Sequence, residues 1–225
     1  MGVDGGSNTF GEFPIHQVQL DSFFIGRTPV TQIFWNSVVG KAENPSFFVG
    51  SQRPVEGVSW INILKTFIPK INEQTHDSRP VGFFFRLPTE AEWEFAAKGG
   101  CKSKGYLFAG SDNPGAVAWY SKNCHGETKD VGQKQPNELG LFDMSGNVWE
   151  WCWDWKNNNY YRQCKEKGLV ANPLGPEKGT NKVLRGGAWS HSQINCLVHV
   201  RDHSHHFNIL NDVGFRLVLS PLILK

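Results

Sequence analysis

The middle of this chain shows little of the periodic patterning that marks helices and strands. Residues 100–182 are rich in Gly, Asn, Pro, Ser and Trp, and clean periodic segments are few among them. Backbone polar groups in long irregular segments still need hydrogen-bond partners, which buried side chains and neighbouring loops must supply. We therefore expect a loop-rich body held together by buried Trp side chains. Loops of this length in a compact domain more often serve a function than arise by accident.

Regular structure is predicted ahead of this body. Residues 16–25 alternate crudely between polar and apolar and predict a strand. Thr31 is expected to cap a short helix that carries Ile33, Phe34 and Val38 on one side.

Two further helices are predicted before residue 100. Ser59 should cap the first of them, and Pro69 should kink it or end it early, because proline lacks an amide proton and clashes with the preceding turn. The other begins with a capping box, in which Thr89 and Glu92 each satisfy a backbone donor of the first turn. The helix capped by Ser59 is predicted to bury a face made of Trp60, Leu64, Phe67 and Ile71. The helix capped by Thr89 is predicted to bury Trp93, Ala96 and Ala97.

Strand patterns return late in the chain, at residues 182–184 and 215–219. Early helices followed by a loop-rich body around a small antiparallel sheet make the expected fold class α+β. A length of 225 residues fits one large domain or two small ones, and we expect residues 1–225 to form a single domain.

Charge and hydropathy exclude two classes of partner. The formal net charge is +2 with both signs interspersed, and no basic run offers the electrostatic footprint of a nucleic-acid-binding protein. No apolar stretch approaches the length of a membrane span, and the first residues lack the features of a signal peptide. We expect no nucleic-acid partner, and membrane attachment only through an anchor absent from this sequence.

The segment from Ser190 to Asp212 is written in a restricted set of amino acids. It contains no Lys, Glu, Met, Trp or Gly, and it holds five of the eight His residues of the chain. All of its residues except Gln193 can be encoded by a codon that ends in a pyrimidine. Mutation of adenines in Asn-type codons would give this mixture. We interpret residues 189–212, called the window below, as a diversified binding surface.

The cysteine pattern supports neither a disulfide framework nor a four-cysteine zinc site. The count of five is odd, and no CxxC pair occurs. One bridge is open to the chain, but most of the thiols are expected to be buried and free.

Motifs on both sides of the window resemble those of a known family. They are, in chain order, PVEGVSW from Pro54, RLPTEAEWE from Arg86, NELGLFDMSGNVWEW from Asn137, RGG from Arg185 and GFR from Gly214. This order resembles the formylglycine-generating-enzyme-like, or sulfatase-modifying factor, family over roughly residues 16–219. The resemblance implies a variant of the C-type lectin fold with few regular elements and long irregular loops. It says less about function, because the fold hosts several activities.

An enzyme is one function that this resemblance offers. Formylglycine-generating enzymes use two cysteines, five residues apart after the Gly-Gly segment, to hold copper and carry out oxidation. Those two positions in this chain are His191 and Cys196, so only the second thiol is present. One thiolate cannot supply a two-thiolate metal site. We expect no enzymatic activity, and a copper oxidase or related enzyme that uses Cys196 is the alternative.

The chain resembles more closely the variable proteins of diversity-generating retroelements, in particular the treponemal ones. In that class, adenine mutagenesis rewrites a segment between Gly-Gly-(Ser/Ala)-Trp and Gly-Phe-Arg, and the protein binds a ligand. Spacing suggests that Cys196, Val198 and Arg201 are fixed scaffold positions, and Gln193 should be fixed because its codon ends in a purine. The predicted ligand-binding positions, with side chains pointing outward, are Ser190, His191, Ser192, Ile194, Leu197, His199, Asp202, His203, Ser204, His205, Phe207, Asn208, Leu210, Asn211 and Asp212.

We expect no resident metal or cofactor. Residues 203–206 hold three His, but no Cys or Glu stands at ligand spacing from them, and a randomised segment yields His by chance. The resemblance leaves open a structural calcium ion near Asn147 and Glu150. The competing interpretation pairs Glu150 with an arginine of the flanking motifs. The Trp residues of 149–155 are expected to be buried core and not a sugar platform.

The expected partner is a protein or a glycan on another cell or surface. Some twenty residues in one patch would form about one side of a standard interface, roughly 800 Å². The resemblance implies cell-surface display, by outer-membrane anchoring, or secretion.

Overall fold

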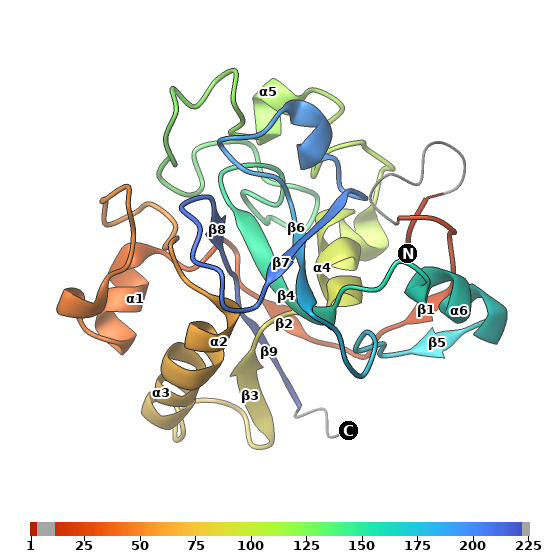
Figure 1. Cartoon of the computed structure of the whole chain (residues 1–225), viewed down its shortest axis with the longest axis horizontal. Coiled ribbons are helices and arrows are strands. Elements are labelled where there is room, and N and C mark those ends of the chain that lie inside the picture. The colour runs from red at the N-terminus through yellow and green to blue at the C-terminus, as the bar shows by residue number, and fades with distance from the viewer. Residues whose placement is uncertain (4–11, 222–225) are drawn as a thin grey trace.

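The computed structural model describes residues 1–3 and 12–221, and its helices and strands are short (Figure 1). The helices are α1 (Gln32–Val38), α2 (Trp60–Asn62), α3 (Ile68–Gln74), α4 (Glu90–Ala97), α5 (Pro114–Val117) and α6 (Tyr160–Lys167), with 3-10 turns at Lys41–Glu43, Gly100–Lys102 and Gln193–Cys196. The strands are β1 (Val18–Gln19), β2 (Phe24–Ile25), β3 (Phe83–Arg86), β4 (Trp149–Trp155), β5 (Val170–Ala171), β6 (Asn181–Arg185), β7 (Arg201–His205), β8 (Val213–Gly214) and β9 (Val218–Pro221).

Three sheets organise these strands. The largest has the order β7-β6-β4-β8 and is antiparallel except for the β4–β8 pair. A second sheet, β2-β9-β3, is antiparallel, and a third pairs β1 with β5 in parallel. Helix α4 packs against β4 and β6 of the largest sheet. The predicted antiparallel sheet is present, but two parallel pairs accompany it.

Two predicted strands are broken. Residues 16–25 form β1 and β2 instead of one strand, because each piece pairs with a different sheet. Of the strand predicted at residues 215–219, only the last two residues are strand, in β9, because Phe215–Leu217 is a buried, non-strand segment between β8 and β9. Strand β4 lies in the body expected to be irregular. Trp occupies four alternate positions of this strand, and the acidic residues between them are buried as well. The strand therefore lacks the solvent-facing polar side that usually marks a strand of alternating pattern.

Helix α1 begins as predicted but buries a different face. The Thr31 side chain caps it by accepting from the Phe34 amide. Ile33 and Phe34 are 51% and 37% exposed, so the predicted inner face is wrong except for Val38, which is buried. The buried face is led by Trp35, whose ring stacks on Phe67 with centroids 5.2 Å apart.

The second predicted helix is longer than Pro69 suggests. Ser59 caps it through a 3.2 Å hydrogen bond from the Asn62 amide. A π-helical turn at Ile63–Phe67 then shifts the hydrogen-bond ladder, and α3 begins with Pro69 in its first turn. Proline is tolerated there because a first-turn amide needs no helical partner. Pro69 therefore does not end the helix, and only the type of helix changes locally.

Helix α4 confirms the predicted capping box. Thr89 Oγ1 accepts from the Glu92 amide at 3.2 Å, and Glu92 Oε2 accepts from the Thr89 amide at 2.8 Å. The predicted inner residues are buried, led by Trp93 at 0% exposure. Glu90 and Glu94 are also buried, so α4 is enclosed on more sides than its apolar stripe indicates.

Buried Trp side chains hold the loop-rich body, as expected. Trp149 and Trp151 are at most 1% exposed, which confirms a core role for the start of β4. Trp151 Nε1 donates to Val58 O at 3.0 Å, and Trp60 Nε1 donates to Cys152 O at 3.0 Å. These bonds join α2 and its preceding loop to the largest sheet. All five cysteines are free thiols, and only Cys101 is exposed.

Truncation of a core Trp should be far more damaging than truncation in the window. Trp93→Ala should lower the free energy of unfolding by about 3–5 kcal/mol, because it leaves a cavity in the core. It also removes the donor that Trp93 Nε1 supplies to Glu150 at 2.7 Å. The exposed Ser192→Ala should change stability by less than about 0.5 kcal/mol. Urea melts of both variants measure this, and equal losses would contradict the assignment of scaffold and window.

Candidate ligand-binding surface

Two glycines let the chain turn beneath the window. Gly186 and Gly187 have φ angles of 100° and 77°, in the left-handed region that favours glycine. A Cβ on Gly187 would meet Cys196 Sγ at 2.7 Å and Asn195 O at 2.8 Å. A side chain at Gly187 would therefore push the first part of the window off the scaffold.

The two ends of the window are tied to each other. Trp189 Nε1 donates to Asn211 O at 3.1 Å, and Ser190 Oγ donates to Asp212 Oδ2 at 2.7 Å. The Trp149 amide of β4 donates to Asp212 O at 2.8 Å. The window therefore leaves the scaffold and returns to it at one place. Figure 1 shows it in blue, passing β6 as strand β7 and ending beside β8.

Buried ion pairs attach the window to helix α4. Arg201 in β7 donates from Nε and Nη2 to the Glu90 carboxylate at 2.5 and 2.6 Å. Arg185, just before the window, donates from Nη2 to Glu94 at 2.5 Å. Burial alone would raise the pKa of Glu94, but Arg185 and Lys98 outweigh it and hold this pKa at about 2. Burial is likewise outweighed by Arg201 and Arg185, which lower the pKa of Glu90, so both carboxylates are charged partners of the arginines at neutral pH.

Arg185 also holds the main chain of the window. Its Nη1 donates to the carbonyl oxygens of His199 and Val200, both at 2.8 Å, and its Nη2 donates to Val198 O at 3.0 Å. These bonds go to backbone atoms, so they do not depend on the window side chains. A third arginine, Arg216, follows the window and pairs with Glu150 through Nε and Nη2 at 2.6 and 2.7 Å.

The predicted scaffold positions of the window are buried. Cys196, Val198 and Arg201 are 0%, 4% and 1% exposed. Val200, which was not among the predicted scaffold positions, joins them at 2%. The buried positions face the core, which explains how a segment of unusual composition keeps a fixed path.

Most predicted binding positions are accessible. Ser190, Ser192, Ile194, His203, Phe207, Asn208, Leu210 and Asn211 are exposed, while His191, His199, Asp202, His205 and Asp212 are partly exposed. Burial lowers the pKa of His199.

Two of the predicted outward side chains do not point outward. Ser204 is 8% exposed because it lies opposite the buried Lys182 in the β6–β7 pair, and it accepts from Asn208 Nδ2 at 2.9 Å. Leu197 packs against the main core. These two positions belong with the scaffold.

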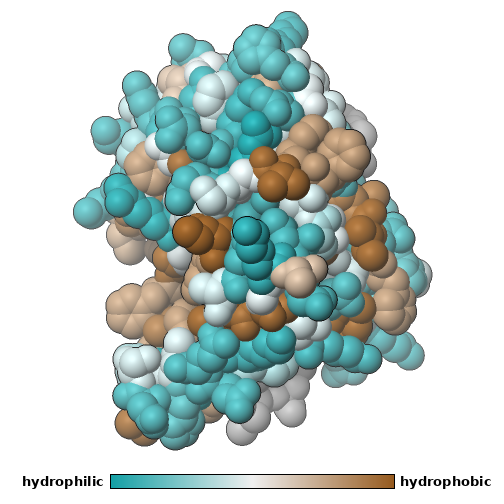
Figure 2. Space-filling view, turned by 90° about the vertical axis from the view of Figure 1, so that its left-hand side faces the viewer, coloured by the Kyte–Doolittle hydropathy of each residue, from teal (hydrophilic) through white to brown (hydrophobic). Residues whose placement is uncertain are grey.

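A fixed loop outside the window extends the surface, which sequence reasoning missed. Phe47 and Val49 are 71% and 79% exposed, and the ring of Phe48 packs edge-on against Trp189 at 5.1 Å. Ile209, inside the window but not among the predicted positions, is 64% exposed. The loop lies on the left-hand side in Figure 1, and Figure 2 shows this side with hydrophobic groups among hydrophilic ones. Three consecutive apolar residues before Gly50 were the available signal.

Glu56 lies buried between this loop and the window. Its Oε1 accepts from the Phe48 amide at 2.8 Å, while Oε2 is buried without a hydrogen-bond partner among the described residues. The next residue, Gly57, donates its amide to Leu210 O of the window at 3.0 Å. Burial raises the pKa of Glu56 to about 7, and the nearby Asp212 acts in the same direction.

Glu56→Gln should therefore stabilise the protein in a pH-dependent way. A carboxyl whose pKa is higher in the folded than in the unfolded state stabilises the fold at low pH, and this contribution is lost as pH rises through about 7. The variant should be about 1–3 kcal/mol more stable than the parent at pH 8, with the gain fading below about pH 5. Chemical denaturation across this range measures the difference. A difference that stays constant with pH would show that Glu56 is ionised normally.

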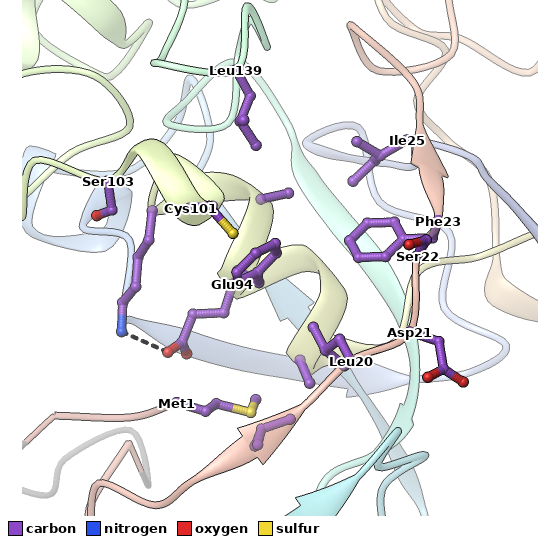
Figure 3. Close-up of a pocket in the computed structure, with 16 residues that line it drawn as sticks. Met1, Leu20, Asp21, Ser22, Phe23, Ile25, Glu94, Cys101, Ser103 and Leu139 are labelled. Atoms are coloured by element: carbon purple, nitrogen blue, oxygen red, sulfur yellow. Dashed lines mark hydrogen bonds and ion pairs between the residues drawn. The ribbon is translucent and has the colours of Figure 1, made fainter.

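A separate cavity lies away from the window. This cavity of about 650 Å³ is bounded by β1, β2 and the outer side of α4. Figure 3 shows Leu20, Phe23 and Ile25 on one side and Glu94, Cys101 and Ser103 on the other. Glu94 is already held there by Lys98 at 2.7 Å, the pair marked by the dashed line. No residue of the window is among those described as lining this cavity.

Comparison with known proteins assigns the family. The model of the sulfatase-modifying factor enzyme 1-like domain matches residues 1–221. The chain belongs to this family. Chaperone protein LppX of Paenibacillus barcinonensis is 34% identical, over 80% of this chain and 87% of that protein. A formylglycine-generating enzyme of Streptomyces coelicolor is 36% identical, over 60% of this chain and 42% of that protein.

A solved structure supports the same family and the predicted relationship to variable proteins. Treponema denticola variable protein 1 matches with a TM-score of 0.82 and 32% identity, over 97% of this chain and 91% of that one. The predicted fold class, a C-type lectin fold of the formylglycine-generating-enzyme-like subtype, is confirmed.

Asn147 and Glu150, near which the resemblance left a structural calcium ion open, both make protein contacts. Asn147 Oδ1 accepts from the Lys129 amide at 3.0 Å, and Glu150 is held by Arg216 and Trp93. The arginine pairing of Glu150 is thus the interpretation that the geometry supports. Among the residues that the structure describes, no three His, Cys, Asp or Glu side chains are placed to hold a metal ion. Burial raises the pKa of the Cys196 thiol to about 12.

Proposed function

We propose that this protein is a non-enzymatic binding protein that presents the window as a diversified surface on a rigid scaffold. One observation carries the proposal. Within the window, buried positions anchor the chain, while most of the remaining side chains are accessible. The similarity to a variable protein over nearly the whole chain supports it.

The rigid attachment explains how such a surface would bind. Ordering flexible side chains and loops opposes association, so a preorganised surface keeps more of its contact energy as affinity. The tie from the Trp189 indole to the backbone carbonyl of Asn211 closes the window before any partner arrives. Changing the accessible side chains would then alter which partner binds without changing the path of the backbone.

The surface chemistry favours a protein or glycan partner. Exposed Phe207, Ile209 and Phe47 offer aromatic and aliphatic anchors beside polar His and Asn side chains. A relative named as a chaperone is consistent with polypeptide binding. Within the described residues, no helix is long and apolar enough to cross a membrane. We propose display at the cell surface or secretion.

A pair of libraries tests the proposal. One library varies Ile194, Asp202, His203, His205 and Phe207, and the control library varies the buried Cys196, Val198, Val200 and Arg201. Most members of the first should fold and be displayed on yeast, because surface changes usually shift stability by less than about 0.5 kcal/mol. The control library should be largely lost.

Selection for new binders should succeed only from the first library. Equal loss of display in the two libraries would show that the window is core, and the proposal would fail. The coding locus offers an independent check, since a near-copy of the window differing at adenines, beside a reverse transcriptase gene, is expected there.

The alternative, a copper oxidase that uses Cys196, predicts tight binding of Cu(I). We expect none, because His191 replaces the first cysteine and burial keeps the Cys196 thiol protonated. Anaerobic titration against a Cu(I) chelator measures the affinity, with Cys196→Ser as the matched control. One equivalent held tightly by the parent but not by the control, with oxygen-dependent oxidation of a cysteine peptide, would favour the enzyme.

A further inference from the structure

A second hollow opens at the β7 end of the window. Its volume is about 410 Å³, and it lies between the segment that follows β4, the segment that precedes β6, and β7 itself. It is lined by Lys156, Asn157, Asn158, Lys178, Gly179, Thr180, Asn181 and His203. All but His203 are outside the window, so the hollow combines a fixed wall with one predicted variable position.

The lining suits a ligand that is both anionic and rich in hydrogen-bonding groups. Its residues supply two lysine ammonium groups, three amides, a hydroxyl and an imidazole, and none of those described is acidic. Lys156 is partly buried, and burial lowers its pKa to about 8, with Arg201 acting in the same direction. The absence of apolar side chains from this described lining argues against an aliphatic or aromatic anchor.

An aromatic cluster lies directly beside the hollow. Trp155, His205, His206 and Phe207 form it, with the rings of Trp155 and His206 5.4 Å apart and those of His206 and Phe207 4.3 Å apart. His206 Nδ1 lies 3.4 Å from Thr180 O.

The cluster is held in place next to the hollow. A Cβ on Gly179, in the hollow wall, would meet Trp155 Cβ at 2.9 Å, so the wall lies against this ring. Lys182 Nζ lies 3.7 Å from the centroid of the Trp155 ring, within the range of a cation–π contact. Phe207 is 58% exposed.

We propose that this hollow binds an acidic sugar residue, one that carries a carboxylate or a sulfate. The ammonium group of Lys178 would face the anion, the amides of Asn158 and Asn181 would bond the ring hydroxyls, and the aromatic cluster would cover an apolar ring face. The combination distinguishes an acidic sugar from a simple anion, which needs no amides, and from a neutral sugar, which needs no lysines. This inference rests on the proposed function and names a ligand class for one end of the same surface.

His203 would set the choice among ligands. It is accessible, and its Nδ1 lies 3.8 Å from Asp202 Oδ1. Asn and Asp are both products of the same codon variation, but only Asp would add a negative charge to the hollow. His203→Asp should therefore repel an acidic sugar, whereas His203→Asn should leave the pocket able to bind it.

Calorimetric titration of the whole chain tests this with five probes: galacturonic acid, galactose 6-sulfate, galactose, sodium acetate and sodium sulfate. At least one acidic sugar should bind more tightly than galactose and than its matching simple anion. Lys178→Gln should weaken that binding roughly tenfold, because a charge-assisted hydrogen bond is lost. His203→Asp should weaken it more than His203→Asn does. Lys104→Gln, an exposed lysine outside the hollow, should have no effect.

The outcomes are separable. Binding of galacturonic acid alone assigns the carboxylate as the anion, and binding of galactose 6-sulfate alone assigns the sulfate. Equal binding of an acidic sugar and its simple anion, absence of binding by both acidic sugars, or binding unchanged by Lys178→Gln and His203→Asp would overturn the inference. Melting curves of both variants should match that of the parent, since the two side chains are exposed. The library selection reports on the proposed function separately, so either can fail without the other.

Discussion

The whole arrangement depends on arginines that are buried against glutamates. Arg201 lies inside the window, Arg185 precedes it and Arg216 follows it, and each is at most 1% exposed. Removing one partner of such a pair typically costs about 3–5 kcal/mol, since the other charge is left buried and uncompensated. A well-packed apolar replacement of both partners can be neutral or stabilising, so net stability does not explain why charges are used here. Their geometry does, because a guanidinium directs several donors at fixed angles.

That geometry matters most for the backbone of the window. Arg185 binds one carboxylate and three consecutive carbonyl oxygens of residues 198–200, a task that no apolar side chain can perform. A segment whose side chains are free to change needs its position fixed by groups that do not change. The glycine pair at 186–187 and the tie from Trp189 to Asn211 serve the same end. In the proposed function, binding and structural support would thereby be divided between different atoms of one segment.

Sequence reasoning succeeded where one local interaction decides the outcome. The caps at Thr31, Ser59 and Thr89 were predictable because each is a hydrogen bond within one turn. It failed where distant partners decide. The inner face of α1 is set by contacts of Trp35 with Phe67 and Phe215, and residues 16–25 divide because their two halves join different sheets. Ser204 looked like any accessible strand residue until its pairing with buried Lys182 was known.

Strand β7 is the edge of its sheet, and it lies within the window. On an edge strand, alternate amides point toward the neighbouring strand, and here that neighbour is the fixed β6. Proline has no amide proton, so it can replace only residues whose amide points away. When both adenines of an Asn-type codon change to cytosine, the product is proline. Proline at a β7 position whose amide points to β6 would break a hydrogen bond of the sheet. Some sequences that such codon changes can produce would therefore not fold, and the number of folded surfaces would be smaller than the number of encoded sequences.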